Sequence, residues 1–119
     1  MEIWACINGF GCKYQVSTWG RIRNESGQIL KPFETEKGYL KIVLQNEQGK
    51  HRLRVHRIVA STFLYNPYGY DCVNHIDGNK KNNSVSNLEY CDNADNQKHA
   101  RALKNGDIQA ASGKYARRF

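Results

Sequence analysis

The stretch that decides the fold of this 119-residue chain is residues 72–91, which read CVNHIDGNKKNNSVSNLEYC. Residues 71–75, which overlap its first end, and residues 88–91 at its other end predict short β-strands bounded by turn-forming residues. Residues 77–83 between them consist of turn formers and charged side chains, so they predict a loop. The pattern therefore predicts two paired strands joined by a long polar loop that is rich in asparagine.

A helix is predicted to follow the second strand. Asp92 is a good helix N-cap, residues 94–104 have high helix propensity, and the Asn-Gly pair after them is a typical helix end. Asn96 and His99 are three positions apart, so they project from one face of that helix.

Side chains with metal-binding chemistry gather at the strand end and on this helix. His75 ends the first strand beside the potential oxygen ligands Asn74 and Asp77. A first strand that faces the start of the helix would bring them close to Asn96 and His99. Such a set of groups suits one hard divalent cation with an imidazole beside it.

A second hairpin with a basic outer face is predicted upstream, from residues 39–45 and 50–56. Alternation in the latter strand predicts one face with His51, Leu53 and Val55 and the opposite face with Arg52, Arg54 and His56. Residues 57–64 then show a helical pattern that should stop before Asn66-Pro67. Further short strands are predicted at 14–17 and 21–23, so the fold class is α+β.

The basic surplus of the chain is concentrated in two segments. The 18 Lys and Arg against 11 Asp and Glu give a formal net charge of +7. Residues 37–57 and 101–119 carry this surplus, whereas residues 58–100 are slightly acidic. Basic flanks are what a polyanion-binding surface requires, although a solvated surface can show the same net charge.

Membrane and secreted classes are disfavoured. No apolar run approaches about 18 residues, and the N-terminus lacks the basic segment of a secretory signal. We therefore expect a soluble cytoplasmic protein with no membrane partner, in which Cys6, Cys12, Cys72 and Cys91 are reduced and buried. No C-x-x-C pair is present, so a zinc-stabilised domain has little support.

The central motifs resemble the ββα-metal (His-Me finger) motif of HNH homing endonucleases, and most of all the phage nicking enzymes encoded by group I introns. The resemblance covers about residues 3–105, nearly the whole chain. Its motifs are Tyr14-Gln15-Val16-Ser17, Gly20-Arg21-Ile22, Val55-His56-Arg57-Ile58-Val59-Ala60, Val73-Asn74-His75-Ile76-Asp77-Gly78-Asn79-Lys80, Asn82-Asn83, Asn87-Leu88-Glu89-Tyr90 and Asn96-Gln97-Lys98-His99-Ala100.

The resemblance implies a division into three parts. Residues 1–50 would be an antiparallel β-sheet region that forms a nuclease-associated DNA-binding module. Residues 51–105 would be the HNH nuclease domain, and residues 106–119 a basic tail.

The resemblance also implies site roles. His75 would be the general base that deprotonates the attacking water, and Asn87 would hold the loop that follows His75 in place. Asn74 and Asn96 would hold one Mg²⁺ or Mn²⁺ ion, which stabilises the leaving 3′ oxygen.

One position departs from the nearest members of the family, in which an aspartate precedes the catalytic histidine. This chain has Asn74 there, and a neutral amide oxygen is a weaker ligand for a hard cation than a carboxylate. Asp77 or His99 are the candidates to compensate.

The implied partner is double-stranded DNA, bound by a monomer without a small-molecule cofactor, in a phage-encoded protein that acts inside the host cell. Phosphate contacts are expected from Arg21, Arg23, Arg52, Arg54, Arg57, Lys80 and Lys81. The first hypothesis is thus a metal-dependent endonuclease that nicks or cleaves duplex DNA. The alternative is a non-catalytic DNA-binding module derived from such a nuclease.

Overall fold

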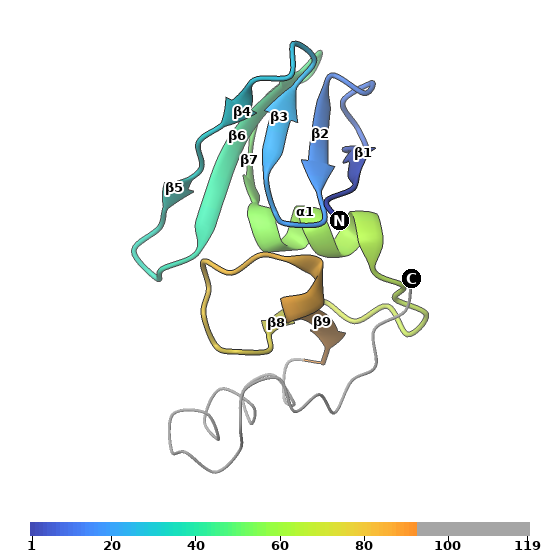
Figure 1. Cartoon of the computed structure of the whole chain (residues 1–119), viewed down its shortest axis with the longest axis vertical. Helices are drawn as coiled ribbons and strands as arrows, with labels where there is room; N and C mark the ends of the chain where they lie inside the picture. The colour runs from blue at the N-terminus through green and yellow to red at the C-terminus, as the bar shows by residue number, and fades with distance from the viewer. Residues whose placement is uncertain (93–119) are drawn as a thin grey trace.

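The computed structural model describes residues 1–92, which form three antiparallel sheets and one α-helix (Figure 1). The strand orders are β1-β2-β3-β4, β5-β6-β7 and β8-β9. The strands are β1 (Trp4–Cys6), β2 (Tyr14–Ser17), β3 (Ile22–Asn24), β4 (Ile29–Leu30), β5 (Phe33–Glu34), β6 (Leu40–Asn46), β7 (Gly49–Arg54), β8 (Cys72–His75) and β9 (Leu88–Cys91). The helices are α1 (Val55–Phe63) and the 3-10 turn η1 (Val85–Asn87). In the described part, no helix has the length and apolar character needed to cross a membrane.

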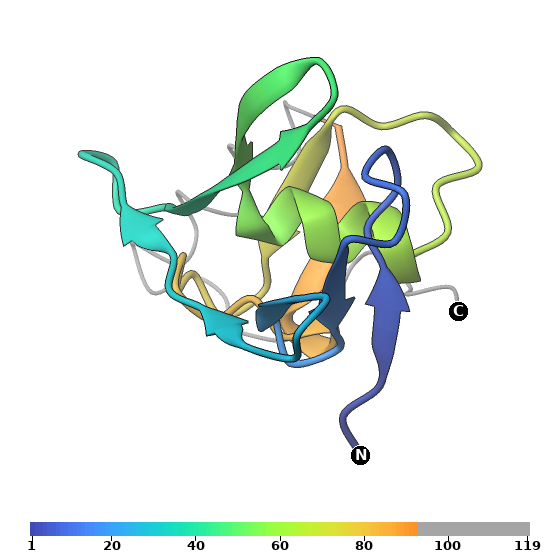
Figure 2. The same cartoon turned by 90° about the horizontal axis from the view of Figure 1, so that it is seen from above.

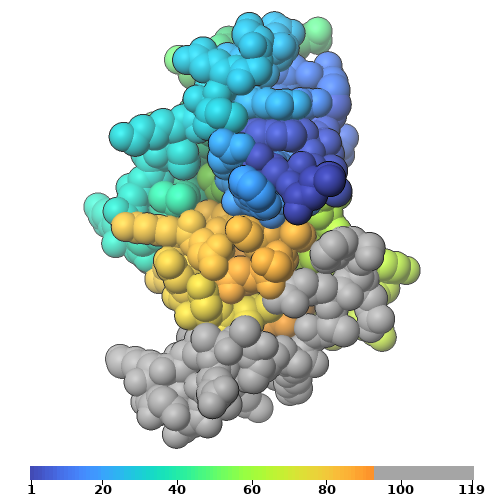
Figure 3. Space-filling model, viewed as in Figure 1, coloured from blue at the N-terminus to red at the C-terminus, as the bar shows by residue number. Residues whose placement is uncertain are grey.

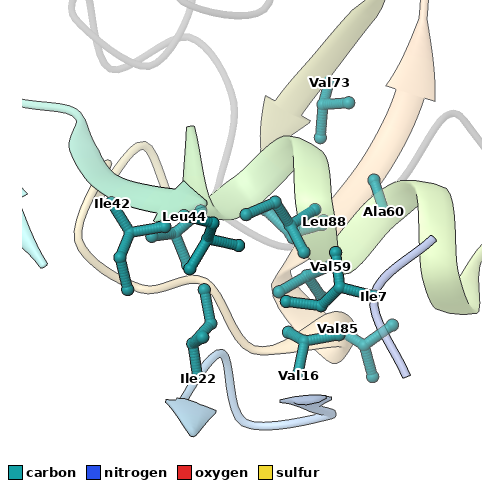
Figure 4. Close-up of a cluster of buried hydrophobic side chains, with 12 residues drawn as sticks. Ile7, Val16, Ile22, Ile42, Leu44, Val59, Ala60, Val73, Val85 and Leu88 are labelled. Atoms are coloured by element: carbon teal, nitrogen blue, oxygen red, sulfur yellow. The ribbon is translucent and has the colours of Figure 1, made fainter. Parts of the chain in front are cut away.

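Helix α1 is the element around which the sheets are arranged. Seen from above, it lies between the β6–β7 hairpin and the N-terminal sheet, with β8 and β9 behind it (Figure 2). Apolar side chains from all three sheets meet there in one buried cluster (Figure 4). The cluster includes Val16 and Ile22 of the first sheet, Ile42 and Leu44 of the second, Val73 and Leu88 of the third, and Val59 and Ala60 of α1.

The predicted α+β class and the strand–loop–strand arrangement of residues 72–91 are confirmed. The helix predicted at 94–104 and the tail at 106–119 lie outside the described residues, so the complete ββα-metal motif stays a prediction. The division into domains also stays a prediction, and its expected boundary after residue 50 lies within β7.

The start of α1 corrects one detail of the second hairpin. The outer face of β7 carries the exposed Arg52 and Arg54, as predicted, but Val55 and His56 belong to the helix. Both of these residues are buried. Two consecutive buried side chains do not fit a strand with one solvated face, whereas they fit the apolar side of a helix.

The cysteine prediction is wrong for two of the four residues. Cys6 and Cys12 are exposed and form a disulfide, with Cα atoms 4.8 Å apart. The turn between them brings the two ends together, and Ile7 N donates a hydrogen bond to Tyr14 O at its base. Cys91 is buried as expected, whereas Cys72 is only half-buried.

The N-terminal sheet contacts the polar loop through the turn between β2 and β3. Gly20 has a φ of +87°, and a Cβ atom there would lie 2.8 Å from the backbone oxygen of Asn83. Beside it, Val85 N donates to Thr18 O at 2.8 Å. Figure 3 shows the surface of the N-terminal sheet resting on the surface of this loop. The loop conformation therefore depends on a close backbone approach that only glycine permits.

Gly20→Ala should destabilise the protein by more than about 1 kcal/mol, because it adds both a left-handed strain and a clash with the Asn83 backbone. Urea denaturation measures the change. Gly27→Ala is the matched control, since Gly27 has a φ of +83° with nothing within 4 Å of the added Cβ. Equal losses for the two variants would contradict the importance of the contact with Asn83.

Candidate functional site

The loop after β8 is organised by the side chains of Asn87 and Asp77. Asn87 Oδ1 accepts a hydrogen bond from Asp77 N at 3.0 Å, and its Nδ2 donates to Asp77 Oδ1 and to Asn82 O, each at 2.9 Å. Asp77 also accepts from Asn79 N at 2.8 Å and from Asn82 Nδ2 at 3.0 Å. These bonds cross the loop and fix its shape.

The electrostatics of Asp77 follow from these contacts. Burial raises the pKa of its carboxyl, but hydrogen bonds from Asn82, the Asn79 backbone and Asn87 outweigh burial and keep the pKa below its ordinary value. Asp77 is therefore an ionised carboxylate whose two oxygens already accept three hydrogen bonds within the loop.

The predicted base, His75, is the last residue of β8 and is 6% exposed. Its Nε2 lies 2.7 Å from Asn83 Oδ1. With the amide oxygen of Asn83 assigned as the acceptor, Nε2 carries the proton and Nδ1 carries the free lone pair of the neutral ring. The hydrogen bond thus orients the imidazole and selects its tautomer.

An aromatic stack encloses the other side of His75. The His56 ring of α1 lies 4.9 Å from the His75 ring, between centroids, and Tyr39 stacks on His56 at 5.2 Å. Tyr39 also lies 6.1 Å from His75. The imidazole of His75 is thereby packed against the first residues of the upstream hairpin and helix.

Burial lowers the pKa of both histidines in this stack. The pKa of His56 falls to about 3, because burial is reinforced by His75, Arg57 and Arg54. For His75, the bond to Asn83 and the charge of Asp77 oppose burial but leave the pKa lowered. Both rings are therefore neutral near pH 7, and a neutral His75 can accept a proton.

Asn74 points to the opposite face of β8 from His75, since neighbouring strand residues alternate. It pairs across the sheet with Glu89 of β9, and Asn74 Nδ2 donates to Glu89 Oε1 at 3.1 Å. Both side chains are buried, at 6% and 2% exposure. An amide oxygen and a carboxylate are donors that fit a hard divalent cation such as Mg²⁺.

Basic residues of the second hairpin and of α1 line one cleft. A hollow of about 680 Å³ is lined by Lys41, Arg52, Arg54 and Arg57, with Tyr90 and Ser61 among its other residues. Lys41 and Arg54 are direct cross-strand partners. Like charges placed opposite one another destabilise a sheet, so this arrangement suits an anionic ligand.

The other predicted phosphate contacts lie elsewhere. Lys80 Nζ lies 4.7 Å from the Tyr39 ring centroid and donates to Lys37 O at 2.8 Å, and Lys81 forms an ion pair with Glu34 at 3.2 Å. On the N-terminal sheet, Arg21 pairs with Glu2, and Arg23 lies 4.1 Å above the Trp4 ring.

Some site residues were missed from the sequence, and two predicted ones are not described. Asn96 and His99 lie outside the described residues. Asn83 and Glu89 were not predicted as site residues, although alternation along β9 could have placed Glu89 opposite Asn74. Tyr39 had no local signal, because its contact with the histidines joins segments distant in sequence.

His56 should make the protein sensitive to acid. Folding favours its neutral ring, so this contribution to stability is complete above pH 6.5 and is lost as the pH falls towards 3. His56→Phe keeps a ring in the stack that cannot be protonated. Its free energy of unfolding should therefore fall less than that of the wild type between about pH 7 and about pH 4, measured by urea denaturation. If the free energies of unfolding of the two proteins fell in parallel with pH, the prediction that His56 is buried as a neutral ring would be contradicted.

Comparison with known proteins agrees with this architecture. Residues 2–56 match the NUMOD4 motif. An HNH endonuclease of Acanthamoeba polyphaga mimivirus is 46% identical over 88 residues, which are 73% of this chain and 26% of that protein. DNA endonuclease I-HmuI of Bacillus phage SP01 is 37% identical over 91 residues, which are 73% of this chain and 51% of the phage enzyme.

A solved structure describing DNA binding and cleavage by the HNH homing endonuclease I-HmuI is similar in fold. It superposes with a TM-score of 0.77 at 31% identity and covers 90% of this chain and 61% of I-HmuI. The chain thus spans between a quarter and three fifths of the length of these relatives. The chain is therefore similar in sequence and fold to HNH homing endonucleases over most of its length, and its residues 2–56 match the NUMOD4 motif.

Proposed function

We propose that this chain is a metal-dependent DNA endonuclease, or the catalytic part of one, which hydrolyses phosphodiester bonds by nicking or cleaving duplex DNA. The observation that carries the proposal is the neutral, buried His75, oriented by Asn83 at the end of β8 beside a rigid polar loop. The similarity of the chain to I-HmuI, which binds and cleaves DNA, supports DNA as the substrate.

In the proposed reaction, His75 Nδ1 takes a proton from a water molecule as the water oxygen attacks phosphorus. The bond from phosphorus to the 3′ oxygen then breaks. A divalent cation, when bound, supplies stabilisation of the negative charge on that leaving oxygen. Asn74 would hold the cation, together with Asn96, and Asn87 would hold the loop in position through its bonds to Asp77.

The proposed DNA contacts combine the basic cleft with the cations near the loop. Arg52, Arg54 and Arg57 lie on one cleft, and Arg54 also lies 5.3 Å from the Tyr39 ring centroid. Lys80 is within 4.7 Å of that ring, so it links the cleft to the surroundings of His75. Phosphate groups on this path would be neutralised along a strip that leads to the base.

His75→Ala should lower the rate of cleavage by at least about a hundredfold, because it removes the base. DNA affinity should stay nearly unchanged, because the substitution removes no positively charged side chain. Supercoiled plasmid incubated with Mg²⁺ or Mn²⁺ provides the assay, with EDTA as the metal-free control. Open-circle product indicates nicking and linear product indicates double cleavage. Salt-sensitive binding without cleavage by the wild type would instead favour the non-catalytic DNA-binding module, for which the neutral Asn74 is the supporting observation.

Replacing Arg52 or Arg57 by alanine should weaken DNA binding across sequences and lower the slope of log affinity against log salt by about one per residue. Fluorescence anisotropy at several salt concentrations measures both quantities. Lys31→Ala, which removes an exposed cation outside the cleft, is the matched control. An unchanged salt slope in the arginine variants would show that the cleft does not contact DNA.

A further inference from the structure

The proposed cation site lacks a negatively charged ligand at Asn74. Asn74 is a neutral ligand, and hard divalent cations in proteins are normally bound by at least one carboxylate. The site therefore needs an acidic side chain close to Asn74.

Asp77 is poorly suited to that role. Both of its oxygens accept hydrogen bonds from the loop, from Asn79, Asn82 and Asn87. Binding a cation through them would compete with the bonds that fix the loop around His75. Asp77 is better explained as part of the loop scaffold.

Glu89 has the required position. It is the direct cross-strand partner of Asn74, and it is the one acidic side chain among residues 1–92 that is buried. The bond from Asn74 Nδ2 to Glu89 Oε1, at 3.1 Å, fixes the amide by its nitrogen, so the amide oxygen is the atom available as a ligand.

The strand geometry also separates the two functions of the site. Alternation places Asn74 and Glu89 on one face of the β8–β9 pair and His75 on the other. A phosphodiester at the end of β8 could then meet the base from one side and the cation from the opposite side. Such opposed positions are what displacement of a leaving oxygen by water requires.

We propose that Glu89 supplies the carboxylate of the divalent-cation site and, with Asn74, forms its donor pair. This inference rests on the proposed metal-dependent function. The negative charge that an aspartate at position 74 would supply is thus provided by Glu89 on the neighbouring strand.

Mn²⁺ binding to the protein without DNA, measured by titration calorimetry and by the loss of free-ion signal in electron paramagnetic resonance, tests the pair. Glu89→Gln leaves two amides and should weaken binding roughly tenfold or more. The double variant Asn74→Asp/Glu89→Gln exchanges carboxylate and amide across the strands and should recover affinity to within about threefold of the wild type. Glu47→Gln, at an exposed acid in the β6–β7 turn, is the control for net charge and should have no effect.

Two results would overturn the proposal. One is Mn²⁺ affinity in Glu89→Gln equal to that of the wild type. The other is a loss of Mn²⁺ affinity in Glu89→Gln that the exchanged pair does not recover, which would assign Glu89 to the stability of the sheet. Urea denaturation of each variant measures that stability directly. Wild-type protein that binds Mn²⁺ through this pair but cleaves no plasmid would refute the nuclease and leave the cation site intact. Wild-type cleavage together with unchanged Mn²⁺ binding in Glu89→Gln would support the nuclease and refute the role of Glu89 in the cation site.

Discussion

Helix α1 must bury the apolar side chains of its first two turns, and all three sheets of the described chain pack against it to do so. The apolar residues Val55, Ile58, Val59 and Ala60 supply most of this face. His56 is buried on the same helix, so the packing that forms the core also places an imidazole against His75. The environment of the proposed base is therefore a consequence of the core.

The N-terminal region contributes to the site as well as to the fold. Gly20 approaches the backbone of Asn83, whose side chain bonds His75, and Tyr39 completes the stack on His56. Both contacts come from the region that matches the NUMOD4 motif. The region expected to bind DNA thus also forms part of the wall around the proposed catalytic histidine.

Residues 77–83 of the polar loop reach a fixed shape without an apolar side chain among them. Asn87 and Asp77 bond to each other and to the loop backbone, and these bonds satisfy groups that burial would otherwise penalise. The same arrangement engages the oxygens of Asp77. The carboxylate that remains buried beside Asn74 is Glu89, on the opposing strand.

Local signals in the sequence were sufficient for the strands at 72–75 and 88–91, the loop between them and the basic outer face of the second hairpin. Strand alternation and turn chemistry act over a few residues, so they can be read without the fold. The start of α1 was misjudged because alternation continues by chance through Val55 and His56. The Cys6–Cys12 pair was missed because the expected cytoplasmic setting favoured reduced thiols.

The sequence by itself determined the order of β2, β3, β6, β7, α1, β8 and β9 and marked His75 and Asn74 as candidates, because residue type and spacing carry that information. Asn87 was identified through the resemblance to HNH endonucleases. Only the tertiary structure decided what surrounds them: Asn83 on Nε2, His56 and Tyr39 on the ring, and Glu89 opposite Asn74. The physical reason is that burial, stacking and cross-strand pairing join residues far apart in the chain. The lowered pKa of His75 follows from these contacts, and no local pattern encodes it.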